Sequence, residues 1–169
     1  SKHYSYDIYP STTPNKDDIK NTLSLFMSKG EIEPITFSIY PLKDLKNVKI
    51  EVSDLKGENS IIPKNKISVN IVRYMRRNLL HRQKSIYYYR YRVEPRLLMP
   101  YQEIDIEKEL TKRYWLNIKT DKNIPAGIYT GKIIIKPKNS ASSTLSLKVK
   151  VLPIVLPETR FQAGFHQTN

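Results

Sequence analysis

Apolar and polar side chains alternate along several stretches of this chain. In residues 35–40, the apolar residues Ile35, Phe37 and Ile39 fall on one side and the residues between them are polar. A period of two is typical of a β-strand with one buried face. The pattern recurs at 48–52, 67–74, 114–118, 128–135 and 145–151. Each stretch is therefore predicted to be a strand in a sheet that has one face in water.

Short polar segments rich in Gly, Pro, Asn, Asp and Ser separate the predicted strands. They are residues 28–31, 54–59, 63–65, 121–127 and 138–140. Turn residues at such short intervals are typical of sandwiches with tight connections. The chain is therefore predicted to be all-β, an antiparallel immunoglobulin-like β-sandwich of about eight strands formed by residues 22–157.

Residues 17–30 fit a helical period as well as a strand period. The strand is favoured by the alternation of Leu23, Leu25 and Met27. Gly30-Glu31 then joins this segment directly to the next strand, as the turn of a hairpin would. We predict a strand from about Thr22, with 14–21 as a loop or short helical turn and 1–21 as an N-terminal arm or loop.

The clearest local signal lies in residues 113–136. Alternating residues at Tyr114–Lys119 lead into the turn residues of Ile124-Pro125-Ala126-Gly127, and a second alternating run begins at Ile128. Pro and Gly supply the backbone angles that a reversal of the chain needs. This segment is predicted to be a hairpin that forms part of the scaffold and carries no catalytic group.

Composition limits the kinds of protein this chain can be. Its 169 residues, of which 39% are hydrophobic, suit one domain with a single core. The mean hydropathy is −0.52, and no apolar run is long enough to predict a membrane-spanning helix. The sequence has no cysteine, which excludes disulfides and thiolate metal sites.

Catalytic chemistry has few candidates in this sequence. There is no G-x-S-x-G motif, no His-x-x-x-His pair and no carboxylate-rich metal loop. Asp105, Glu107 and Glu109 alternate, and two carboxyl groups facing one sugar are what a glycosidase needs. Their segment is polar, however, which indicates a solvated edge. No catalytic, metal-binding or cofactor-binding residue is predicted.

Positive charge is concentrated in one segment. The formal net charge is +13, and residues 73–96 hold seven Arg and Lys84 against Glu94 alone. Arg grips phosphate, carboxylate or sulfate in a bidentate manner, and Tyr stacks on sugars or bases. The candidate ligand-binding residues here are Arg76, Arg77, Arg82, Tyr87, Tyr89, Arg90 and Arg92.

Three interpretations of this Arg/Tyr segment stay open. It can be a long solvated loop flanked by a Tyr-rich strand, with Arg stems covering apolar surface. It can instead contact an acidic glycan or another polyanion. A nucleic acid is the least favoured partner, because no nucleic-acid fold signature accompanies the charge.

Trp115 is the other candidate for ligand contact, since aromatic rings are common platforms for sugars. The alternation around it allows either Trp115 or the set Tyr114, Leu116 and Ile118 to point inward. A lone Trp in a sandwich strand is more often a core residue. We therefore expect Trp115 in the core and retain it as a candidate.

An ordered series of short motifs resembles a known family. The series comprises the motifs Gly30–Pro34, Tyr40–Val48, Val52–Leu55, Glu94–Leu98, Tyr114–Leu116, Ile124–Gly131 and Val151–Pro157. Together these motifs are similar to the N-terminal β-sandwich domain of bacterial glycoside hydrolase-like proteins related to the family 123 β-N-acetylgalactosaminidases. The resemblance covers most of residues 22–157.

This resemblance implies a non-catalytic accessory module of a secreted, extracellular or cell-envelope protein. In the family, the sandwich precedes a catalytic (β/α)8 barrel, so residues 158–169 are expected to be a linker toward that domain. The expected partners are the barrel of the same polypeptide and carbohydrate, with no nucleic acid and no membrane span. The alternative is an autonomous binding module for an acidic glycan or other polyanion.

Overall fold

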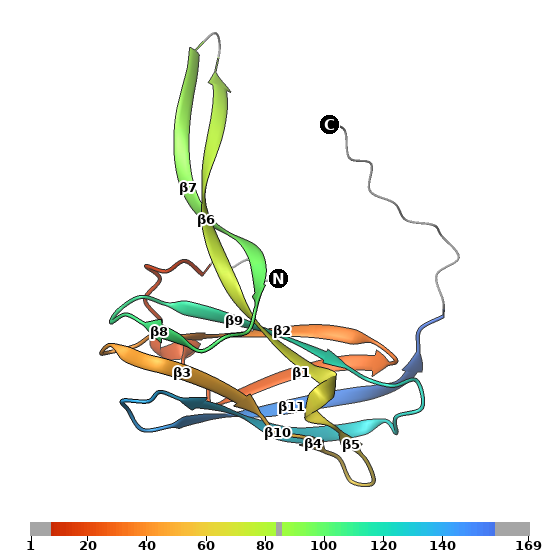
Figure 1. Ribbon diagram of the computed structural model, residues 1–169. Coiled ribbons are helices and arrows are strands. Elements are labelled where there is room, and N and C mark those ends of the chain that lie inside the picture. Colours follow the sequence, from red (N-terminus) through yellow and green to blue (C-terminus); the bar gives the residue numbers. More distant parts are fainter. Residues whose placement is uncertain (1–7, 84–85, 158–169) are drawn as a thin grey trace.

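The computed structural model describes residues 8–83 and 86–157, which form two packed sheets (Figure 1). The long strands are β1 (Thr22–Lys29), β2 (Ile32–Ile39), β3 (Leu45–Val52), β6 (Ile67–Gln83), β7 (Ile86–Pro100), β9 (Lys112–Lys119), β10 (Gly127–Lys136) and β11 (Ser143–Val155). The short elements are β4 (Leu55–Lys56), β5 (Ile61–Ile62), β8 (Ile104–Ile106) and the 3-10 turns η1 (Lys16–Asp18) and η2 (Lys64–Lys66). The predicted all-β sandwich is confirmed, and its immunoglobulin-like strand order stays a prediction.

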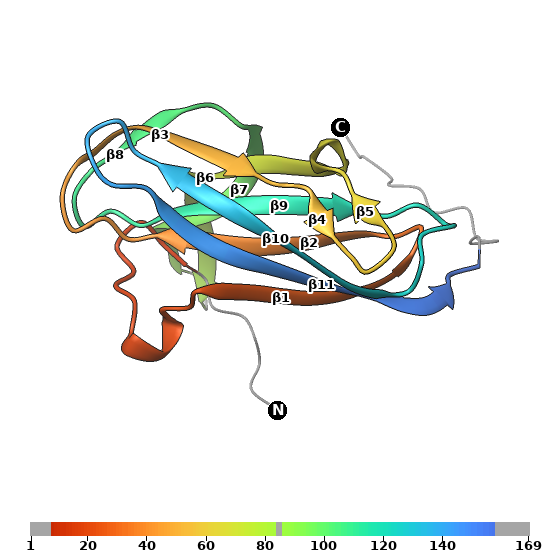
Figure 2. The ribbon, with the colours of Figure 1, turned by 90° about the horizontal axis from the view of Figure 1, so that it is seen from below.

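Figures 1 and 2 show the two layers from the side and from below. The seven-stranded sheet has the order β1-β11-β10-β3-β8, with β4 also paired to β10 and β5 paired to β4, and the four-stranded sheet has the order β2-β9-β6-β7. Described neighbours pair in antiparallel fashion except β1 and β11, which are parallel. This parallel pair departs from the predicted antiparallel arrangement. A tight turn requires its two strands to be antiparallel, but β1 and β11 are too distant in sequence to be joined by one.

The core lies between the facing sides of the two sheets. Val48, Leu116, Ile118, Ile133, Leu147 and Val149 have no exposed surface. Tyr114 is equally buried, and its ring stacks on Phe37 with 5.3 Å between the ring centroids. The alternation along the chain therefore predicted the buried face of most strands.

Two connections that the sequence predicts as hairpins are corners between the sheets. β1 pairs with β11 in one sheet, whereas β2 pairs with β9 in the other. β9 and β10 likewise belong to opposite sheets. Both hairpin predictions are wrong, because turn residues fix a reversal of direction and leave the pairing partner to packing across the core.

Buried polar bonds hold these corners. The hydroxyl of Tyr129, at the start of β10, donates to the carbonyl of Pro125 at 2.8 Å, in the manner of a tyrosine corner. Gly131 lets β10 approach its neighbours closely, since a Cβ there would lie 2.5 Å from the Leu55 side chain. At the other corner, Thr120 Oγ1 donates to the carbonyl of Ser28 at 3.1 Å. The Pro-Ala-Gly-x-Tyr-x-Gly motif thus builds a crossing between sheets.

β6 and β7 extend beyond the sandwich as a two-stranded ribbon that rises away from both sheets (Figure 1). β6 pairs with β9 only from Ile67 to Ile71, but it pairs with β7 as far as Gln83 opposite Ile86. The long loop of the solvated-loop interpretation is therefore wrong, whereas its Tyr-rich strand is present as the first part of β7. In this segment, Arg and Tyr do not give a regular alternation of polar and apolar residues. The period-two pattern of a half-buried strand therefore ends where the ribbon begins.

Candidate functional site

The candidate site is one continuous surface made of the outer face of the four-stranded sheet and the ribbon. We define the ribbon as residues 74–83 and 86–95. Asn70 pairs with Trp115 of β9, and alternate positions along β6 lead from Asn70 through Val72 to Tyr74 and Arg76. Alternate residues of a strand share a face, so the ribbon continues the outer face on which Trp115 lies.

Trp115 lies on the outer face and not in the core. Its neighbours Tyr114 and Leu116 have no exposed surface, and Trp115 is half-buried. The indole Nε1 donates to Asn117 Oδ1 at 2.9 Å, which fixes the ring against its own strand. The prediction of a core Trp is wrong because the larger set of three apolar residues takes the inward side. An aromatic face with amide and hydroxyl neighbours suits a sugar ring.

Arg113 lies at the foot of the ribbon, on the same outer face. One of its terminal nitrogens, Nη2, donates to Thr36 Oγ1 at 3.1 Å, and its Nε is buried without a hydrogen-bond partner among the described residues. Tyr74 lies nearby and donates its hydroxyl to the carbonyl of Ile8 at 2.6 Å. Burial raises the pKa of Tyr74, and the positive charge of Arg113 partly offsets this effect.

The arm that precedes β1 packs against this foot. Thr111 is buried, and its amide and hydroxyl donate to the carbonyls of Pro10 and Thr12 at 2.7 and 2.6 Å. Between the arm and the ribbon lies an open hollow lined by Tyr9, Pro10, Ser11, Tyr91, Val93 and Leu110. Residues 8–12 therefore help to shape the candidate surface.

The strand register places the Arg and Tyr positions of the ribbon on two faces. Arg77 is opposite Arg92 and Leu79 is opposite Arg90, while Asn78 is opposite Tyr91 on the other face. On that second face, the Arg76 guanidinium lies 4.0 Å from the centroid of the Tyr91 ring. This cation–π contact joins the two strands of the ribbon.

The structure describes the side chains of two predicted candidates, Arg76 and Trp115. For Arg77, Arg82, Tyr87, Tyr89, Arg90 and Arg92 it describes the backbone pairing, and their side chains lie outside the described residues. Sequence reasoning missed Arg113 and Asn117, which alternate with Trp115 along β9. Their spacing would have identified them had Trp115 been assigned to the outer face.

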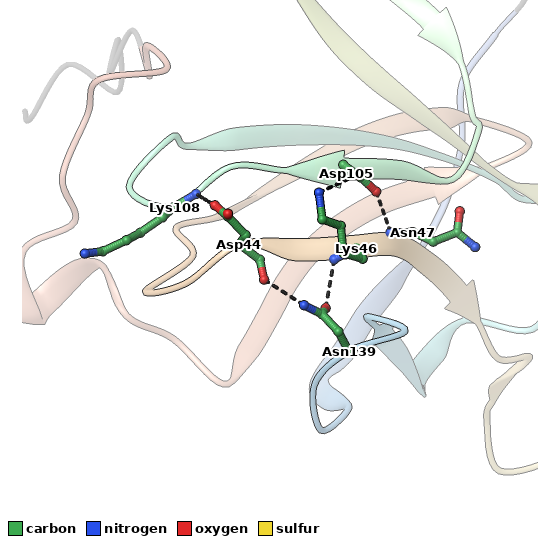
Figure 3. Close-up of polar contacts among 6 residues, drawn as sticks. All are labelled: Asp44, Lys46, Asn47, Asp105, Lys108 and Asn139. Carbon is green, nitrogen blue, oxygen red and sulfur yellow. Dashed lines mark hydrogen bonds and ion pairs between the residues drawn. The ribbon is translucent and has the colours of Figure 1, made fainter.

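The acidic residues near β8 hold loops together (Figure 3). Asp105 accepts hydrogen bonds from the backbone N of Asn47 at 2.8 Å and from Lys46 Nζ at 2.9 Å. The hydrogen bond from Asn47 and the one from Lys46 lower the pKa of Asp105. Asp44 accepts a bond from the backbone N of Lys108 at 2.8 Å. Asp105 is thus held ionised, which suits a structural anchor.

In residues 8–83 and 86–157, no group of three His, Asp or Glu side chains is arranged to hold a metal ion. In the same residues, no helix has the length and apolar character needed to cross a membrane.

The chain is similar to known proteins in sequence and in fold. A family model described as the glycoside hydrolase 123 N-terminal domain matches residues 5–137. A solved family 123 glycoside hydrolase from Clostridium perfringens, studied for glycolipid glycan hydrolysis, is similar with a TM-score of 0.72 and 24% identity. The match covers 81% of this chain and 24% of that enzyme's chain.

A second solved structure, the ASH/PapD-like domain of human CEP192, has a TM-score of 0.39 and 11% identity, covering 90% of this chain and 97% of that one. None of the curated proteins matches this chain. At 24% identity the likeness to the clostridial enzyme shows a shared fold.

Proposed function

The chain belongs to the family of glycoside hydrolase 123 N-terminal domains, and we propose that it is a non-catalytic accessory module that packs on the catalytic domain of the same polypeptide. The observation that carries the proposal is the extent of the family match, which begins in the arm and runs into β10. The chain spans 24% of the length of the clostridial hydrolase, so most of that enzyme lies outside the shared part.

The chemistry of Asp105 and Glu51 supports a non-catalytic role, while burial and the neighbouring Glu31 raise the pKa of Glu33. A glycosidase needs one carboxyl group with a raised pKa to protonate the leaving oxygen. Asp105 has a lowered pKa and is engaged by Lys46 and Asn47. Glu51 also has a lowered pKa, because Lys136 and Lys49 bind it. These carboxylates serve the scaffold.

Exposed apolar residues at the end of β11 support packing against another domain. Ile154, Val155 and Leu156 are each about half exposed, at 50%, 51% and 51%. On the outer face of the seven-stranded sheet, Phe26 and Ile128 flank Lys150 and are 72% and 50% exposed. Exposed apolar residues grouped in this way are typical of interfaces.

The outer face of the four-stranded sheet supports a contribution to carbohydrate positioning. Trp115 presents an aromatic surface there, with Asn117 and Arg113 on the same strand face. Such a surface would hold a sugar chain beside a neighbouring catalytic domain without taking part in bond cleavage.

The proposal is tested by assaying the 169-residue chain with chromogenic β-N-acetylgalactosaminides and related glycosides. We expect no turnover above buffer, and turnover only from a longer polypeptide that includes the downstream domain. Turnover by the chain alone, abolished by Asp105→Asn or Glu107→Gln, would contradict the accessory role.

A further inference from the structure

One face of the ribbon carries three arginine positions, Arg77, Arg90 and Arg92, and Arg73 lies at its base. The register sets Arg77 directly opposite Arg92, and Arg90 follows two residues along β7 on the same face. Arg73, four residues before Arg77 on β6, shares this face and is exposed. We call Arg73, Arg77, Arg90 and Arg92 the arginine row.

The ribbon has one acidic residue, Glu94, which lies opposite Met75 on the same face as this row. Between Arg73 and Val93 the sequence contains neither Asp nor Glu. Like charges placed directly across a strand pair destabilise it, and an isolated two-stranded ribbon is only marginally stable in water. A ligand that supplies several negative charges would remove the repulsion and stabilise the ribbon.

The spacing of the row suits an extended ligand. A strand rises ~3.3 Å per residue, so Arg73 and Arg77 stand ~13 Å apart and Arg90 and Arg92 ~7 Å apart. A single small anion can engage only part of such a row. A linear polymer with recurring anionic groups can engage all of it, and Tyr88, opposite His81 on the same face, adds a position for stacking on sugar rings.

We propose that the arginine row of the β6–β7 ribbon binds a linear anionic polysaccharide through carboxylate or sulfate groups that recur along its chain. A second copy of this protein is a poor partner, because each copy carries a net charge of +13. A two-stranded ribbon can also enter the major groove of DNA. Membership in a glycoside hydrolase family favours the polysaccharide. The proposal does not depend on the accessory role.

The test measures the dissociation constant of the 169-residue chain for four probes at physiological salt. The probes are heparin fragments, which are sulfated, hyaluronan fragments, which carry carboxylates alone, neutral dextran and duplex DNA. We expect binding of at least one anionic polysaccharide, weakened by added salt, and none of dextran. Comparison of heparin with hyaluronan identifies the anionic group.

The variant R77Q/R90Q/R92Q should weaken binding at least about tenfold, since Arg–anion pairs are bidentate. Its matched control is K132Q/K148Q/K150Q, which removes three exposed charges from the outer face of the other sheet. The control should change affinity by about twofold or less, because it is remote from the ribbon.

Equal losses in the two variants would overturn the proposal, because net charge alone would then explain binding. Tighter binding of DNA than of both anionic polysaccharides, or no binding of either polysaccharide, would also overturn it. If R77Q/R90Q/R92Q does not fold, R77K/R90K/R92K tests the proposal instead, because Lys keeps the positive charge but cannot form the bidentate contact of a guanidinium. Weaker binding by this variant supports the row, and unchanged affinity contradicts it.

Discussion

Tyr129 shows how one side chain fixes a corner between the sheets. It is 2% exposed, and its hydroxyl donates to the carbonyl of Pro125 at 2.8 Å. Tyr129→Phe removes this donor and the hydrogen bond that it makes, which should lower the free energy of unfolding by about 1 kcal/mol. Urea denaturation measures the change.

The matched control is Tyr40→Phe. The Tyr40 hydroxyl has no hydrogen bond among the described residues, and its ring is half-buried. This control should change stability by less than about 0.5 kcal/mol. Equal losses for the two variants would show that the corner bond adds nothing specific.

Trp115 shows what a single sequence cannot decide at this scale. The strand has apolar or aromatic residues at successive positions, so both faces look buried between Tyr114 and Leu116. The choice depends on which set fills the core opposite Phe37, and Tyr114 stacks there. Alternation predicted the strand, but only packing across the core assigns its faces.

At the scale of elements, Asp105 ties β8 to the start of β3. Its pKa is lowered by the hydrogen bonds from Asn47 and Lys46, so its ionised form contributes stability above the ordinary aspartate pKa of 3.8. This contribution is lost as the pH falls through the lowered value. Asp105→Asn should therefore lower the melting temperature slightly near neutral pH, by about 2 °C or less for an exposed ion pair.

The same variant should melt with the wild type at a pH below the lowered pKa of Asp105, where both side chains are neutral. Melting curves by circular dichroism at pH 7 and in strongly acidic buffer provide the comparison. A difference that stays constant over this range would show that charge plays no part in the anchor.

The sequence largely predicted which segments are strands, but it did not predict which strands pair with each other. The segments 35–39 and 145–151 show their buried faces in the sequence, and both are strands. The corners at Gly30 and Gly127 carry the same turn residues as hairpins, so local sequence cannot separate the two. The ribbon escaped prediction because its stability depends on cross-strand pairs, such as Arg76 with Tyr91, and not on a buried face.

At the scale of the whole molecule, the ribbon and the end of β11 lie apart (Figure 1). The ribbon carries Arg77, Arg90 and Arg92 and also exposes Met75, Tyr91 and Val93, whereas Ile154, Val155 and Leu156 are exposed at the end of β11. This separation would let one end pack on a catalytic domain while the ribbon stays open to a polymer.

The proposed packing of the sandwich on the catalytic domain of its own polypeptide would cover the exposed apolar residues at the end of β11. Hydrogen–deuterium exchange of the 169-residue chain, compared with a polypeptide that includes the downstream domain, tests it most directly. We expect slower exchange at Ile154, Val155 and Leu156 in the longer protein, with the core amides of β9 unchanged. Equal exchange at these three residues in both proteins would contradict it.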